Sequence, residues 1–149
     1  MAKSLETLLA QINVLSPNRD KSSDGGIGNA EHSARTSDHN PDDDGVVKAR
    51  DFTHDPLHGI DSEKLAEALR ASKDARIKYL ISNRKIAASY ATGGKAAWAW
   101  RPYSGSNPHN HHCHISVLAD AAHYDDTRPW VFDLTVADTQ SSKPEIKSD

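Results

Sequence analysis

The sequence predicts an α+β fold in which a small, largely antiparallel sheet has helices packed on one face. Two observations favour this class: two segments carry apolar residues at helical spacing, and several short runs rich in β-branched and aromatic residues lie between turn-forming stretches. A chain of 149 residues suits one compact domain with a modest core. We therefore expect a single domain over residues 1–136, followed by a polar C-terminal tail at 137–149.

Two helices are predicted. Near the start of the chain, Leu5, Leu8 and Ile12 recur at spacings of three and four, with polar residues between them. The second helix covers residues 61–72 and has one apolar face, and Asp61 is suited to cap its N-terminus. We expect both helices to bury their apolar faces against the sheet.

Five short runs are expected to form strands. They cover residues 46–53, 77–81, 85–90, 112–117 and 130–134. The second and third runs are separated only by Ser82, Asn83 and Arg84, which predicts a β-hairpin.

Residues 16–45 form a long polar stretch in which Ile27 is the only aliphatic residue larger than alanine. We expect this stretch to lie outside the core, and loops of such length are usually either functional or disordered. Its histidines, its aspartates and Arg35 favour a functional loop. The run Asp42, Asp43, Asp44 could indicate a calcium loop, but the spacing does not fit the EF-hand pattern, and a solvated acidic turn is favoured.

Composition excludes several functions. The formal net charge is −3 and the basic residues are scattered among acidic ones, so no nucleic-acid-binding surface is expected. Cys113 is the only cysteine, which excludes an internal disulfide and a cysteine-based structural zinc site. The N-terminus lacks the features of a signal peptide, and no run is long enough to cross a membrane. We expect a monomer made in the cytoplasm, without membrane insertion.

The most informative segment is 107–117, which holds four of the nine histidines. Alternate residues of a strand share a face, so His112 and His114 should point to one side together with Ser116, and Cys113 to the other. A His-x-His pair on the polar face of a short strand indicates a metal or catalytic site. A catalytic zinc takes three protein ligands and keeps one position for water, so further ligands must come from elsewhere.

The segment 35–51 offers those further ligands, since His39 ends the polar loop and Asp51 lies in the strand that follows. With these residues, the chain resembles the zinc D-alanyl-D-alanine peptidases and L-alanyl-D-glutamate endolysins, which share a metal fold with the hedgehog signalling domain. The resemblance is carried by Ser37-x-His39, by Ala49-x-Asp51 with Gly45 upstream, and by His112-x-His114. It spans residues 35–117.

The resemblance implies a zinc-dependent peptidase that cleaves a peptide bond in the stem peptide of bacterial peptidoglycan. It implies His39, Asp51 and His114 as the Zn²⁺ ligands. It also implies substrate-side roles for Arg35 and Ser37. The missing export signal then fits a phage or prophage endolysin that reaches the wall on lysis.

The general base is expected to be a histidine. The segment 104–116 contains no Asp or Glu, whereas the family usually has a carboxylate shortly before the last ligand. Zinc lowers the pKa of its bound water towards ~7, so an imidazole can take the proton, and His109 and His112 are the candidates. Arg35 is expected to hold a substrate carboxylate through paired hydrogen bonds.

Three other interpretations stay open from the sequence. The absence of a carboxylate base allows a non-catalytic zinc-containing binding module on the same fold. Trp98, Trp100 and Tyr103 could stack against wall sugars, although alternating aromatic residues are more often part of a core. Cys113 could act as a thiol nucleophile, although its place between two outward histidines favours a buried side chain.

Overall fold

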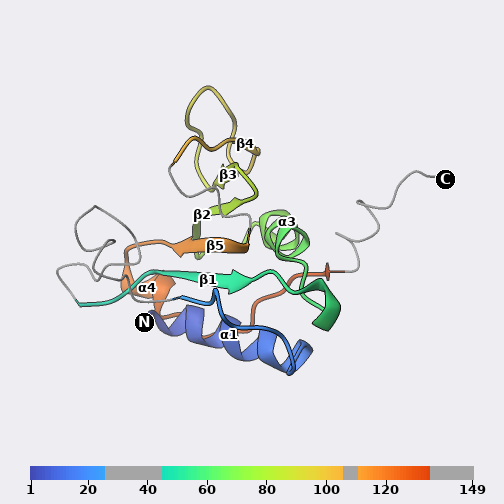
Figure 1. The fold of residues 1–149 in the computed structure, drawn as a ribbon. Helices are drawn as coiled ribbons and strands as arrows, with labels where there is room; N and C mark the ends of the chain where they lie inside the picture. Colours follow the sequence, from blue (N-terminus) through green and yellow to red (C-terminus); the bar gives the residue numbers. More distant parts are fainter. Residues whose placement is uncertain (26–44, 106–110, 135–149) are drawn as a thin grey trace.

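The computed structural model describes residues 1–25, 45–105 and 111–134 (Figure 1). This part of the chain forms an α+β domain with one open antiparallel sheet of five strands and three α-helices, as the sequence predicts. The elements follow in the order α1 (Lys3–Leu15), β1 (Ala49–Thr53), the 3-10 helix η1 (Pro56–His58), α3 (Ser62–Ser72), β2 (Ile77–Ser82), β3 (Lys85–Ala88), β4 (Arg101–Pro102), β5 (His112–Val117) and α4 (Ala121–Tyr124).

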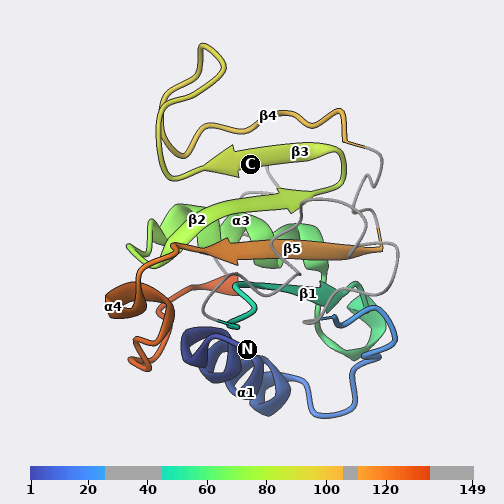
Figure 2. The ribbon, with the colours of Figure 1, turned by 90° about the vertical axis from the view of Figure 1, so that its left-hand side faces the viewer.

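The strand order in the sheet is β1-β5-β2-β3-β4. Although β5 comes last in the chain, it lies between β1 and β2, antiparallel to both (Figure 2). Figure 2 also shows α1 running beside β1 and α3 behind the sheet. The segment that carries the His-x-His pair is therefore an interior strand of the sheet, with a partner on each side.

Both predicted helices are confirmed. In α1 the side chains of Leu5, Leu8 and Ile12 are fully buried, which matches their helical spacing. In α3 the carboxylate of Asp61 accepts hydrogen bonds from the backbone N–H of Glu63 at 3.0 Å and of Lys64 at 3.2 Å, so it acts as the predicted N-cap.

The predicted hairpin is formed by β2 and β3. The two residues between these strands, Asn83 and Arg84, both have positive φ angles, 47° and 66°. Such backbone angles are typical of a two-residue type I′ turn, whose twist matches that of the flanking strands. The turn places Ser82 opposite Lys85.

One face of the sheet joins both helices in a single hydrophobic core. Phe52 and Cys113 lie opposite each other in β1 and β5, and Leu80 lies opposite Ile115 in β2 and β5. All four side chains are fully buried in one cluster with the apolar residues of α1 and α3. The members of this cluster are Ala2, Leu5, Leu8, Ile12, Phe52, Ile60, Leu65, Ala66, Leu69, Ile77, Leu80, Cys113, Ile115, Val117, Tyr124 and Trp130.

The strand predicted at 130–134 is wrong: the described residues there form no strand. Trp130 is instead a core residue whose indole N–H donates to the carbonyl of Ser4 at 2.8 Å. Its backbone N–H and carbonyl both bond to the side chain of Gln11 in α1, at 2.8 and 3.0 Å. Because an amide side chain satisfies both backbone groups, this residue needs no strand partner.

The described part of the polar stretch, residues 16–25, lies outside the hydrophobic core as expected, but it is not fully exposed. Ser16 and Arg19 are buried, at 5% and 3% exposure. Arg19 forms a two-point ion pair with Asp24, at 3.0 and 2.6 Å, and Asp24 accepts hydrogen bonds from the backbone and hydroxyl of Thr53. A buried polar network, in place of apolar packing, therefore fixes residues 16–25 against β1.

Arg76 is the largest of the fully buried side chains in the described part of the chain, with 1% exposure. Its guanidinium bonds to both carboxylate oxygens of Asp74, at 2.9 and 2.7 Å. It also donates to the carbonyls of Asp126 and Arg128 and lies 4.0 Å from the ring centroid of Trp130. Arg76 therefore joins the start of β2 to the segment that follows α4.

Replacing Arg76 with methionine should lower the free energy of unfolding by about 2–4 kcal/mol, because buried carbonyls and a carboxylate lose their partner. Burial raises the pKa of Asp74, but hydrogen bonds from Arg76 outweigh it and hold the pKa below its usual 3.8. The stability linked to this carboxylate is present above its unfolded pKa and is lost as pH falls through the folded one. Urea unfolding should therefore show the difference between wild type and Arg76→Met shrinking below about pH 4.

The matched control is Arg128→Met, since Arg128 pairs with Asp126 but its side chain is 72% exposed. This substitution should lower the free energy of unfolding by less than about 1 kcal/mol. Equal losses for the two variants would contradict the role assigned to Arg76.

Candidate functional site

The polar face of β5 meets a carboxylate of β1. Asp51 lies directly opposite His114 in the antiparallel register, and His112 lies opposite Thr53. Since Cys113, Ile115 and Val117 belong to the core, His112, His114 and Ser116 point to the other face of the sheet, as strand alternation predicts. The two histidines and Asp51 therefore share one face.

The Asp51 carboxylate contacts both imidazoles, one with each oxygen. Its Oδ1 lies 3.1 Å from Nδ1 of His114, and its Oδ2 lies 3.3 Å from Nε2 of His112. Asp51 and His114 are buried, at 8% and 4% exposure, and the side chain of His112 is 14% exposed. We call these three side chains the histidine–aspartate site.

Two neighbours fix the ring of His114. The hydroxyl of Ser116 lies 2.8 Å from its Nε2, and the ring of Tyr79 stacks on it with centroids 5.5 Å apart and planes at 11°. With one ring nitrogen hydrogen-bonded to Ser116, the other is directed at Asp51. Such a second partner is typical of a metal-ligating histidine, because it fixes both tautomer and orientation.

The backbone of Asp51 is hydrogen-bonded on the edge of β1 that faces away from β5. Its N–H donates to the carbonyl of Gly25 at 2.8 Å, so the end of the segment 16–25 lies along the free edge of β1. The Arg19–Asp24 ion pair, which binds Thr53, fixes the same edge two residues further on. This support keeps Asp51 in register with His114.

The buried carboxylate of Asp51 lies within hydrogen-bond distance of the His114 imidazole. A buried carboxylate is costly unless hydrogen bonds or a cation compensate it. Between Asp51 and His114, a proton on the imidazole or a divalent cation can do so. Two ligands of a tetrahedral zinc at about 2.0–2.1 Å lie roughly 3.4 Å apart, and the 3.1 Å separation of Oδ1 and Nδ1 is close to that value. The same separation is that of an ordinary hydrogen bond, so the geometry of this pair allows either a hydrogen bond or a zinc ion between the two atoms.

Of the residues predicted for the site, the structure brings together Asp51, His112 and His114. Arg35, Ser37, His39 and His109 lie outside the described residues. Within 1–25, 45–105 and 111–134, no group of three or more His, Cys, Asp or Glu side chains is arranged to hold a metal ion. Since the predicted ligand His39 is not among those residues, zinc binding stays a prediction.

Two contacts of the site were missed by the sequence reasoning. Tyr79 was placed in a strand but not beside His114, because the pairing of β2 with β5 has no local signal in the sequence. The carbonyl of Gly25 was missed because a polar segment gives no indication that its backbone bonds to a strand edge. Ser116, in contrast, follows from strand alternation alone.

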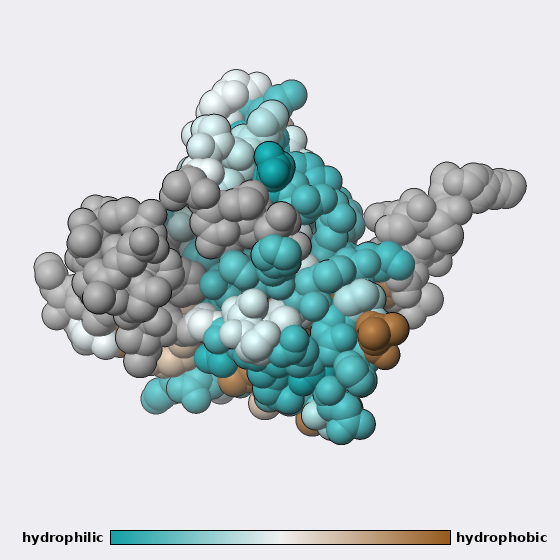
Figure 3. All heavy atoms as spheres, in the orientation of Figure 1, coloured by the Kyte–Doolittle hydropathy of each residue, from teal (hydrophilic) through white to brown (hydrophobic). Residues whose placement is uncertain are grey.

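The surface has no large apolar region on the side drawn in Figure 3, where hydrophilic side chains cover most of the described part and hydrophobic ones are scattered. The exposed large hydrophobic residues of the described chain are Val14, Leu15, Leu57, Tyr90 and Val131. Among the described helices, none has the length and apolar character needed to cross a membrane.

Comparisons with protein-family models, with characterised proteins and with solved structures found no match.

The structure opposes the interpretation of Cys113 as a nucleophile. Its side chain is fully buried in the core, on the face of β5 opposite to the histidines. Burial raises the pKa of the thiol far above its usual value, and the nearby carboxylate of Asp51 adds to the shift. The thiolate needed for nucleophilic attack is therefore not formed near neutral pH.

Native protein should accordingly react with a water-soluble thiol reagent at least about a hundredfold more slowly than urea-unfolded protein, since only the exposed thiolate reacts. The reaction can be followed by the absorbance of the released chromophore. A fast reaction of the folded chain would show that the thiol is accessible.

Proposed function

We propose that this chain is a zinc-dependent peptidase that cleaves a peptide bond in the stem peptide of bacterial peptidoglycan. His39, Asp51 and His114 would hold the metal, and His109 or His112 would move the proton. The observation that carries the proposal is the 3.1 Å approach of Asp51 Oδ1 to His114 Nδ1 on one sheet face, with His112 beside them.

The donor set supports zinc over a harder cation. Imidazole nitrogens suit zinc and other late transition metals, whereas calcium and magnesium take oxygen ligands. Two histidines with one carboxylate is a known ligand set for catalytic zinc, with the fourth position open to water. The hydrogen bond of His114 to Ser116 supplies the second partner that such a ligand requires.

A zinc ion in this place would supply a Lewis acid and a water of lowered pKa. The chain's own residues would do the rest. His112 lies on the same sheet face and is more exposed than His114, so its imidazole can exchange a proton with a substrate. Arg35 would bind a substrate carboxylate through paired hydrogen bonds, and Ser37 would contact the substrate beside it.

The small antiparallel sheet with the histidine–aspartate site on one face and helices on the other is consistent with the hedgehog and D-alanyl-D-alanine peptidase type of fold, which we propose for this chain. Its biological setting would be a phage or prophage lysis protein, monomeric and made in the cytoplasm, that reaches the wall on lysis. The partner in this proposal is the wall peptide, not a nucleic acid or a membrane.

The ligand assignment predicts about one zinc per chain, measured by atomic emission after exhaustive dialysis. His39→Ala, Asp51→Ala and His114→Ala should each lose the metal. Because a metal that binds only the folded state stabilises it, chelation should lower the melting temperature of wild type and leave that of the three variants unchanged.

His123→Ala is a matched control, since His123 is a surface histidine of α4 that pairs with Asp120 and is not part of the histidine–aspartate site. It should keep zinc and the wild-type response to chelation. Stoichiometric zinc in His114→Ala would remove the basis of the assignment and leave the Asp51–His114 pair as a structural hydrogen bond.

The catalytic assignment predicts zinc-dependent release of amino groups from purified peptidoglycan, with no release of reducing sugar. His112→Ala should keep zinc but lose activity by about 100-fold or more, the usual contribution of a general base. A non-catalytic zinc module on the same fold would keep zinc and release no amino groups. That result would favour the binding module, for which the absence of a carboxylate from 104–116 already argues.

A further inference from the structure

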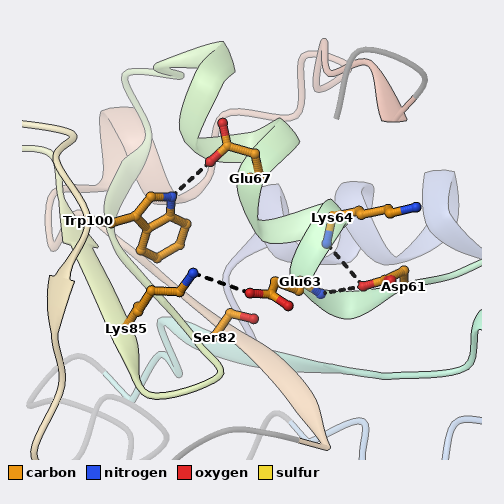
Figure 4. Close-up of a pocket in the computed structure, with 7 residues that line it drawn as sticks. All are labelled: Asp61, Glu63, Lys64, Glu67, Ser82, Lys85 and Trp100. Carbon is orange, nitrogen blue, oxygen red and sulfur yellow. Dashed lines mark hydrogen bonds and ion pairs between the residues drawn. The ribbon is translucent and has the colours of Figure 1, made fainter. Parts of the chain in front are cut away.

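A pocket of about 490 Å³ lies between the start of α3, the β2–β3 hairpin and the segment before β4 (Figure 4). Its volume falls in the range of small-molecule sites. Figure 4 shows the indole of Trp100 on one side, and Glu63, Lys64 and Asp61 from the start of α3 on the other. The lining residues are Asp61, Glu63, Lys64, Glu67, Ser82, Lys85 and Trp100.

This pocket is separate from the histidine–aspartate site. Ser82 lines the pocket and follows Ile81, which lies opposite His114 in the sheet. Since successive residues of a strand point to opposite faces, Ser82 points to the helix side and Ile81 to the histidine side. The two places thus lie on opposite faces, both at the end of the sheet where β5 begins with His112.

Hydrogen bonds orient Trp100 in the pocket wall. Its indole N–H donates to Oε1 of Glu67 at 2.8 Å, and Arg70 clamps Glu67 with two hydrogen bonds of 2.8 and 2.6 Å. The hydrogen bonds from Arg70 hold the pKa of Glu67 below its usual value, so this carboxylate stays ionised and accepts the hydrogen bond from the Trp100 indole. The aromatic ring is therefore oriented before any ligand arrives, which lowers the entropic cost of binding.

Polar groups surround this ring. Lys85 forms an ion pair with Glu63 at 3.2 Å, and both side chains are about half exposed, at 46% and 49%. The Nζ of Lys85 also lies 5.8 Å from the ring centroid of Trp100. Among the lining residues, three carboxylates face two lysines, and Arg70 neutralises one of those carboxylates. The balance of charge therefore suits an uncharged ligand with many hydroxyl or amide groups.

We propose that this pocket binds a saccharide, in the form of an N-acetylated amino sugar of a glycan strand. The C–H face of a pyranose ring is apolar and packs on an indole, while its hydroxyl and amide groups bond to carboxylates, ammonium groups and hydroxyls at the rim. The indole of Trp100 provides the surface on which the sugar ring packs. The carboxylates of Glu63 and Asp61 accept hydrogen bonds from the sugar, and Lys85 and Ser82 donate hydrogen bonds to it. The choice of an amino sugar rests on the proposed function, whereas the preference for a pyranose rests on the pocket.

The test uses the soluble tetramer of N-acetylglucosamine, observed through the indole N–H signals of the full chain by NMR. The Trp100 signal should shift on titration, and the signal of Trp130, which is buried against Ser4, should not. Trp100→Ala should weaken binding by about tenfold, the loss of one stacked aromatic contact. Cellotetraose, which lacks the acetamido groups, should bind more weakly than the amino-sugar tetramer.

Glu63→Gln and Lys85→Gln keep the experiment decisive if Trp100→Ala fails to fold, because both side chains are half exposed and each substitution should weaken binding measurably. Tyr90→Ala is the matched control. Tyr90 is an exposed aromatic residue between β3 and β4 that does not line the pocket, so this substitution should leave the affinity for the tetramer unchanged. No shift of Trp100 at about 10 mM sugar, or equal weakening by Tyr90→Ala, would overturn the proposal.

Asp51→Ala separates this proposal from the peptidase proposal. It removes a residue of the histidine–aspartate site on the opposite face, and it should bind the tetramer as wild type does. Loss of sugar binding in this variant, with the fold intact, would place the sugar on the histidine face and overturn the pocket assignment. Because the titration needs neither zinc nor peptide cleavage, an inactive enzyme that still binds the tetramer would contradict only the peptidase proposal.

Discussion

A carboxylate on a buried sheet face must have a positively charged or hydrogen-bonding partner, and Asp51 meets this requirement by lying directly opposite His114. The pairing of β1 with β5 thus does two things at once. It joins the edge strand β1 to the sheet, and it brings two side chains from distant parts of the sequence within 3.1 Å. A slip of one residue in this register would turn Asp51 away from His114 and towards the core.

The other supports of the site act through this register. The Gly25 carbonyl and the Arg19–Asp24–Thr53 network fix the outer edge of β1, and Tyr79 and Ser116 fix the ring of His114. On the core face of the same strands, Phe52 packs beside Cys113. Packing on one face and hydrogen bonds on the other therefore specify the same alignment.

Periodicity was sufficient to predict α1, α3, the β2–β3 hairpin and the two faces of β5, because each is set by local spacing and by turn or cap residues. It failed at Trp130, where an aromatic, β-branched run forms no strand because Gln11 satisfies the backbone of Trp130. It also failed at Arg19, which is buried through ion pairing and not through apolar character. The proximity of Asp51 to His114 was predicted from a family pattern. The contact of Tyr79 with His114 was not predicted, because it depends on a long-range strand pairing that no local pattern specifies.

The position of β5 between β1 and β2 has a consequence for synthesis on the ribosome. β1 and β2 do not pair with each other. Both pair with β5, which comes after them in the chain, and β5 is the only strand of the sheet next to β1. While the chain is still emerging, the hairpin of β2 and β3 can form locally, but β1 has no neighbouring strand in the sheet. The sheet closes only when residues 112–117 have left the exit tunnel, and most of its stability is acquired in that late step because non-local pairing must follow loop closure. Assembly of the histidine–aspartate site and closure of the sheet are consequently the same event.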